Sequence, residues 1–246
     1  MSLQLIQLAS KLGKFNLREE YGVPPFVIEV LDSTYQLAMA AGIEALENAG
    51  LSIYAPQATQ GEELPRSKRA IVGLPEEMRD ETGIIFASSF PCMESTVREA
   101  GLSAQHMLLA DLEDYKEHTA TMQACPDGEE GQRGKSATVQ AAEQYEYDRK
   151  LLFKLLVMAN NQLAELIHAR GPNVHVNSAC SSMTQAIAIA QDWLRLGRCS
   201  RVVVISADNT TSEDLLPFVG TGFLALTAAS TNPKVETAAL PFDKRR

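Results

Sequence analysis

The sequence has no long apolar run and no excess of basic residues. No apolar stretch approaches the roughly 20 residues that a membrane-spanning helix needs. The first residues, MSLQLIQLASKLGKFN, lack the basic, apolar and small-residue regions of a signal peptide. With a formal net charge of -9, the chain also lacks the clustered Lys and Arg that bind phosphates. These absences predict a cytoplasmic protein with no membrane span and no nucleic-acid partner.

Cysteine and histidine are scarce, with four of each among 246 residues. The cysteines form neither a CxxC clip nor a disulfide framework, and no HExxH pair occurs. The GTG at 220–222 lacks the following glycine and the helix start of a dinucleotide-binding loop. We therefore expect no metal, no nucleotide cofactor and an individual role for each cysteine. The cysteines are Cys92, Cys125, Cys180 and Cys199.

A content of 45% hydrophobic residues is sufficient for a sizeable buried core. Two segments repeat apolar residues with the helical period, and a third helix, rich in small residues, is predicted from Cys180 onward. Short apolar runs rich in β-branched residues predict buried strands. The expected helices are 33–51, 147–169 and 180–196, and the expected strands are 82–88, 173–179 and 201–207. This order predicts a layered α/β fold whose strands are covered on both faces.

Two polar stretches interrupt this pattern. Residues 52–80 carry prolines, mixed charge and glycine-containing turns, and residues 111–146 include the turn-forming run CPDGEEGQRGK. Neither composition can contribute much to a core. We expect both stretches to be surface insertions, the second an excursion or a lid.

Cys180 lies where a predicted strand passes into a predicted helix. At that point a thiol faces the first unpaired N–H groups and the positive end of the helix dipole, which favours the thiolate and can stabilise an oxyanion. Position alone leaves the alternative open that Cys180 is a small buried residue, as most unpaired cysteines are. We expect Cys92 to be an inert loop cysteine and His175 to be structural.

The run VNSACSSMTQAIAIAQDWLRLGRCSRVVVISAD resembles the nucleophile region of β-ketoacyl synthases, in which small polar residues, a helix and a strand follow the reactive cysteine. Three further stretches resemble the same family in the same order. They are STYQLAMAAGIEALENAGL, TGIIFASS and VGTGFLALTAASTNPKVETAALPFDKRR. The resemblance implies a partial synthase N-terminal domain at 32–246, preceded by an unmatched leader at 1–31.

The resemblance implies a thiolase-like fold of α-β-α-β-α layers. It implies that Cys180 accepts an acyl group from the phosphopantetheine of an acyl carrier protein, for decarboxylative condensation with a malonyl unit in fatty-acid or polyketide biosynthesis. It further implies a homodimer and no resident cofactor. Phe223 lies where the family often lines its acyl tunnel, although a Phe in such an apolar stretch is more often a core residue.

The family continues beyond its Pro-Phe-Asp-Lys motif into a second half that carries two histidines and a lysine. The sequence stops at Arg246, and its four histidines lie outside those motifs. We therefore expect a synthase fragment that lacks the C-terminal half and does not complete the condensation alone. The alternatives are a non-catalytic synthase-like subunit, a degradative thiolase, and an unrelated cysteine hydrolase with a His and a carboxylate near the thiol.

Overall fold

The computed structural model describes residues 6, 8–56, 64–124, 140–141, 144–156 and 158–244. Its centre is a parallel sheet in which β1 (Thr82–Ala87) lies between β2 (Asn173–Val176) and β3 (Arg201–Ser206). Ile84 is paired with Asn173 on one side and with Val203 on the other. The three strands that the sequence predicts are therefore confirmed, with β2 ending three residues early and β1 and β3 each ending one residue early.

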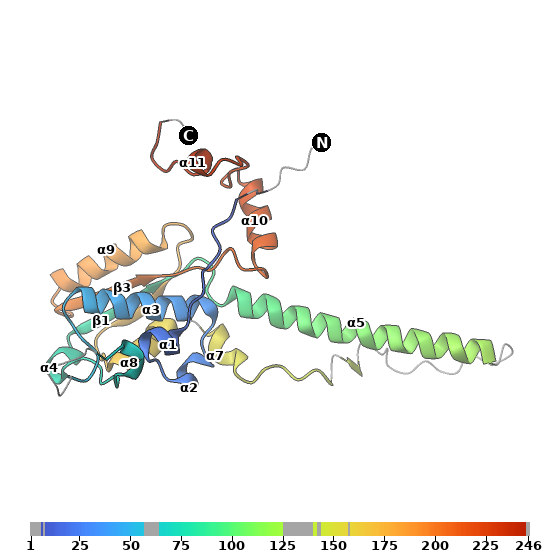
Figure 1. Ribbon diagram of the computed structural model, residues 1–246, viewed down its shortest axis with the longest axis horizontal. Helices are drawn as coiled ribbons and strands as arrows, with labels where there is room; N and C mark the ends of the chain where they lie inside the picture. The colour runs from blue at the N-terminus through green and yellow to red at the C-terminus, as the bar shows by residue number, and fades with distance from the viewer. Residues whose placement is uncertain are drawn as a thin grey trace.

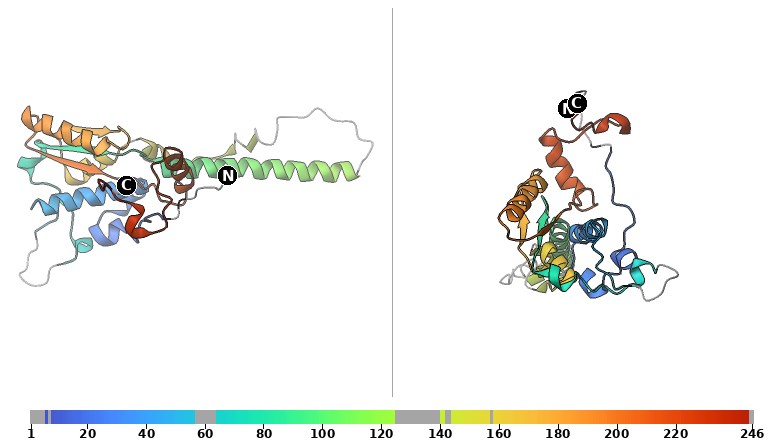
Figure 2. Two further views of the ribbon diagram at one scale, coloured as in Figure 1. Left: turned by 90° about the horizontal axis from the view of Figure 1, so that it is seen from above. Right: turned by 90° about the vertical axis from the view of Figure 1, so that its left-hand side faces the viewer.

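The sheet is covered on both faces because side chains alternate along its strands. Ile84 and Phe86 of β1 pack into the larger core with helices α3 (Ser33–Asn48) and α8 (Ala159–Ile167). Ile85 and Ala87 pack on the opposite face against α9 (Ser182–Arg195). The α-β-α layering that results is visible in Figures 1 and 2.

The outer side of α9 carries an exposed apolar stripe. Met183, Ile187 and Leu194 are 39%, 53% and 46% exposed, whereas Ala186 and Ala190 on the inner side are buried against the sheet. Spacings of four and seven residues place the three exposed side chains on one stripe of the helix. A helix with apolar residues on both sides is typical of an internal layer.

Part of the unmatched leader contributes to the larger core. Asn16 caps α1 (Leu17–Tyr21) by accepting hydrogen bonds from two backbone N–H groups, and α2 (Pro25–Ile28) follows. Leu17 and Tyr21 are buried in the same cluster as α3. The Tyr21 hydroxyl donates to Glu44 of α3 at 2.9 Å.

The two predicted insertions differ in structure. Within 52–80 the described residues form one isolated bridge and two short helices, η1 (Arg66–Lys68) and α4 (Glu76–Arg79). The second predicted insertion, 111–146, begins inside a long helix, α5 (Met93–Ala124), which projects from the body in Figure 1. Polar but helix-favouring residues such as Glu, Lys and Gln explain why a polar composition did not mean a loop. The run CPDGEEGQRGK lies outside the described residues.

The predicted helix 147–169 is wrong as a single element. The chain forms α7 (Leu151–Leu155) and α8, separated by a break at Leu156, whose ψ of 127° is extended. Two side chains from other elements bond to carbonyls at the end of α7: Cys92 donates to Leu155 O, and Tyr35 donates to Leu156 O, each at 3.4 Å. These tertiary contacts satisfy groups that a continuous helix would have used.

The chain ends in α10 (Leu216–Ala225) and α11 (Val235–Ala238), which lie beyond the carboxyl end of the sheet in Figure 1. Gly220 and Gly222 of the GTG sequence are inside α10. Within the described ranges, no helix combines the length and hydrophobicity required to span a bilayer.

Candidate active site

The candidate site lies at the carboxyl ends of the three parallel strands, where loops 88–90, 177–181 and 207–209 meet. In open α/β sheets this edge is the usual place for ligand binding, since the loops there leave the sheet together. The site therefore occupies an expected position for the fold.

Cys180 lies in a tight turn between β2 and α9. Its neighbour Ala179 has a φ of +50°, a left-handed conformation that is uncommon for a residue with a Cβ atom. The Ser182 hydroxyl accepts from Ser178 N at 2.9 Å and donates to Ala179 O at 2.6 Å. The Cys180 side chain is left exposed at the start of α9.

The turn also explains why two predicted boundaries are wrong. Asn177 Oδ1 accepts the N–H of Ala179 at 3.1 Å, so β2 ends at Val176 and not at Ala179. The Ser181 hydroxyl donates to Ser178 O at 2.7 Å, and α9 begins at Ser182, two residues after the cysteine. Side chains of Asn and Ser bond to nearby backbone and favour such turns over strand or helix.

The other described cysteines are less exposed than Cys180. Cys199 is buried, and burial raises the pKa of its thiol. Cys92 lies just before α5 with a φ of +56° and is half-buried. Burial raises the pKa of its thiol as well, and the hydrogen bond with Tyr35 partly offsets this increase. A raised pKa lowers the fraction of reactive thiolate at neutral pH. Cys125 lies outside the described residues.

Three histidines occupy separate places in the fold. His106 of α5 lies 5.6 Å from the Tyr145 ring, and His168 ends α8 in a left-handed conformation. His175 of β2 packs 5.4 Å from the Phe86 ring under the sheet. Among the described residues, no group of three His, Cys, Asp or Glu side chains could hold a metal ion.

His175 makes stability depend on pH. Burial lowers its pKa, and the Asp208 carboxylate opposes this in part. The folded protein therefore binds this proton less readily than the unfolded chain, whose histidines titrate near 6.5, so stability falls as pH drops through and below about 6.5. Between pH 7.5 and 5.5 we expect the melting temperature of the wild type to fall a few degrees further than that of His175→Gln.

Circular dichroism melts at the two pH values measure this difference. His106→Gln, on the exposed part of α5, is the matched control and should lose stability like the wild type. Equal losses in the wild type and His175→Gln would contradict the assignment.

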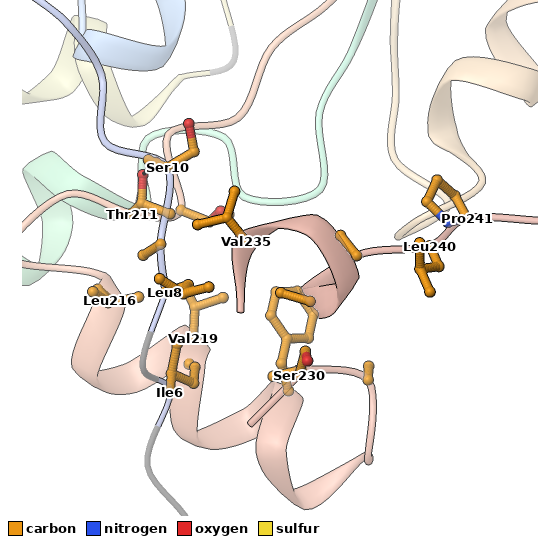
Figure 3. A pocket seen from close by; sticks show the side chains of 18 of the residues that line it. Ile6, Leu8, Ser10, Thr211, Leu216, Val219, Ser230, Val235, Leu240 and Pro241 are labelled. Carbon is orange, nitrogen blue, oxygen red and sulfur yellow. Dashed lines mark hydrogen bonds between the residues drawn. The ribbon is translucent and has the colours of Figure 1, made fainter. Parts of the chain in front are cut away.

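Phe223 of α10 has two kinds of neighbour. Its ring meets Phe90 of the loop after β1 edge-on, with centroids 6.2 Å apart. It also lines an apolar cavity of about 840 Å³ between α10, the N-terminal segment and residues 227–241. Figure 3 shows this cavity, with Ile6 and Leu8 beside Leu216 and Val219. Phe223 thus connects the loop next to the Cys180 turn to this cavity.

Three polar residues of the site were not singled out by the sequence analysis: Ser89, Asn177 and Asp208. They hold the three loops together through hydrogen bonds between Ser89 and each of the other two. A signal was present for Ser89 and Asp208, because each directly follows a predicted buried strand and the ends of parallel strands share one edge. Asn177 lies inside the predicted strand 173–179, and the earlier end of β2 places it in the loop.

Comparisons with known proteins agree with this architecture. A crystal structure of a β-ketoacyl synthase from Burkholderia phymatum STM815 matches 100% of this chain and 45% of its own chain, with a TM-score of 0.51 and 19% sequence identity. The fold is therefore thiolase-like, and this chain spans less than half the length of that synthase. No curated protein matches the chain.

Residues 89–243 match the family described as "Beta-ketoacyl synthase, N-terminal domain". The matched region is more than half of the chain and contains loop 89–90, the Cys180 turn, α9 and β3. The chain belongs to the β-ketoacyl synthase family.

Proposed function

We propose that this chain is the acyl-accepting part of a condensing synthase, with Cys180 as the nucleophile. The observation that supports this most is the exposed Cys180 thiol on a left-handed turn at the start of α9, inside the region matched to the family. A thiol is suited to this role because it is both a good nucleophile and a good leaving group.

In the proposed first step, the Cys180 sulfur attacks the carbonyl carbon of an acyl thioester carried on the phosphopantetheine of an acyl carrier protein. The new carbon–sulfur bond forms as the bond to the carrier breaks, and the released thiol takes up a proton. In the complete enzyme, a malonyl unit loses CO₂ and its carbanion attacks the acyl group, which leaves Cys180. No resident cofactor takes part in either step.

Two surfaces support the proposed assembly. The exposed apolar side of α9 fits a layer supplied by a C-terminal half, which the expected α-β-α-β-α order places there. β2 lies at one edge of the described sheet, with β1 on its other side. An edge strand offers unpaired backbone groups to a second copy, which supports a homodimer. We place this protein in the cytoplasm, in fatty-acid or polyketide biosynthesis.

Acyl transfer tests the proposal. The chain is incubated with an acyl carrier protein that carries a saturated acyl chain, and its mass is measured before and after tryptic digestion. We expect one acyl adduct, on the peptide that contains Cys180, and no β-ketoacyl product when a malonyl carrier is added to the chain alone.

Cys180→Ala should lose the adduct, whereas the matched control Cys92→Ala should keep it. An adduct that persists in Cys180→Ala would contradict the proposed nucleophile. Absence of any adduct in the wild type would favour a non-catalytic synthase-like subunit, and β-ketoacyl product from the chain alone would show that no second half is required.

A further inference from the structure

The carboxylate of Asp208, two residues after β3, holds the loop that follows β1. It accepts hydrogen bonds from the Ser88 hydroxyl at 2.7 Å and from Phe90 N at 2.8 Å. Ser89 N donates to both of its oxygens, at 3.1 and 3.0 Å. Hydrogen bonds to an ionised acceptor are stronger than neutral ones, so this one side chain defines the path of loop 88–90.

The same loop holds the nucleophile turn. The Ser89 hydroxyl donates to the carbonyl of Ala179 at 2.9 Å, and Asn177 Nδ2 donates to the carbonyl of Ser89 at 3.3 Å. Ala179 is the left-handed residue directly before Cys180. Such a conformation persists only where its surroundings fix it, and the Ser89 bond acts on that residue itself.

We infer that Asp208 and Ser89 are positioning residues that present the Cys180 thiol. Asp208 orients Ser89, Ser89 holds the Ala179 carbonyl, and the Ala179 conformation directs Cys180 out at the start of α9. Neither residue forms a hydrogen bond to the thiol. The inference rests on the proposed role of Cys180 and adds to it the residues that keep the thiol in place.

Two variants test the contributions of Ser89 and Asp208 separately. Ser89→Ala removes the bond to Ala179 O and keeps every backbone bond of the loop. Asp208→Asn removes the negative charge and replaces one of the two oxygens that accept the Ser89 N–H by an NH2 group, which cannot accept it. Ser200→Ala is the matched control, because its hydroxyl also bonds a carboxylate, Glu81, but at the opposite end of β3.

The readout is the rate of iodoacetamide alkylation of each cysteine at neutral pH, with peptide mass spectrometry. We expect Cys180 to react at least about fivefold more slowly in both variants, because a relaxed turn moves the thiol away from its exposed position at the start of α9. Cys199 should react at the wild-type rate. Ser200→Ala should match the wild type, and Ser89→Thr, which restores a hydroxyl, should recover most of the Cys180 rate.

Unchanged Cys180 alkylation in both variants would overturn the inference. So would a parallel rise in Cys199 alkylation with a lower melting temperature in both, because the bonds would then hold the whole domain and not the turn. The acyl-transfer experiment fails independently of this one: a wild type that accepts no acyl group refutes the proposed function, while alkylation still reports how the turn is held.

Discussion

Cys180 is expected to be alkylated at pH 7.5 roughly tenfold faster than Cys92 or Cys199. The physical reason is twofold. Cys180 is exposed, whereas Cys199 is buried and Cys92 half-buried, and burial raises the pKa of both of those thiols. Peptide mass spectrometry after timed exposure to iodoacetamide gives the three rates from one sample.

The selectivity should narrow as pH rises, because thiols with raised pKa values gain most of their thiolate at alkaline pH. Cys180→Ala is the control and should leave the rates of Cys92 and Cys199 unchanged. Alkylation of Cys199 as fast as Cys180 at pH 7.5 would show that the buried site opens readily, and the ranking by exposure would be wrong.

Gly171→Ala is expected to destabilise the fold by about 3 kcal/mol or more, which lowers the melting temperature by roughly 6–12 °C. A Cβ atom at Gly171 would lie 2.4 Å from the carbonyl oxygen of Thr82 and 2.7 Å from its carbon. These are backbone atoms at the start of β1 and cannot rotate away. The substitution must therefore move residue 171 away from β1. This movement strains the neighbouring hydrogen bond, in which the Pro172 carbonyl accepts the N–H of Ile84 at 2.9 Å.

Gly101→Ala provides the matched control in thermal melts. Gly101 lies inside α5 and a Cβ atom there meets nothing within 4 Å. Because alanine favours a helix over glycine by about 0.5–1 kcal/mol, this variant should be as stable as the wild type or more so. A Gly171→Ala protein that melts with the wild type would contradict the close approach of the two backbones.

Much of the central fold could be predicted because its signals are local. The strand run RVVVIS and the helix from Ser33 carry their periodicity within a few residues, and Asp32 caps that helix through its own side chain. The order of the strands is not a local property. β1 lies in the centre because it pairs with residues 89 and 119 positions further along the chain, and no short pattern records that choice.

The errors in the helices came from tertiary contacts and from composition. The break after Leu155 depends on Cys92 and Tyr35, which lie far away in the sequence. Their side chains donate hydrogen bonds to the carbonyls of Leu155 and Leu156, respectively. α5 continues into the predicted insertion because charged residues such as Glu and Lys, which are frequent in loops, also favour helices.

The residues of the candidate site, too, could be predicted from the sequence only in part. Cys180 could be found from the strand-to-helix transition and the resemblance around it. The roles of Ser89 and Asp208 could not, since their partners are 90 and 119 residues away. Phe223 was predicted as either a core residue or a tunnel residue, and its contacts with Phe90 and with the cavity are compatible with both interpretations.

The central position of β1 has a consequence for synthesis on the ribosome. Ala87 is paired with Ser206, so 119 residues must be added before this pairing can be completed. At roughly 5–20 residues per second, that interval is on the order of 6–24 s, during which the fully buried central strand lacks its β3 neighbour. A nascent chain stalled before β3 should therefore expose β1 to proteases and chaperones, and one stalled well after Ser206 should protect it.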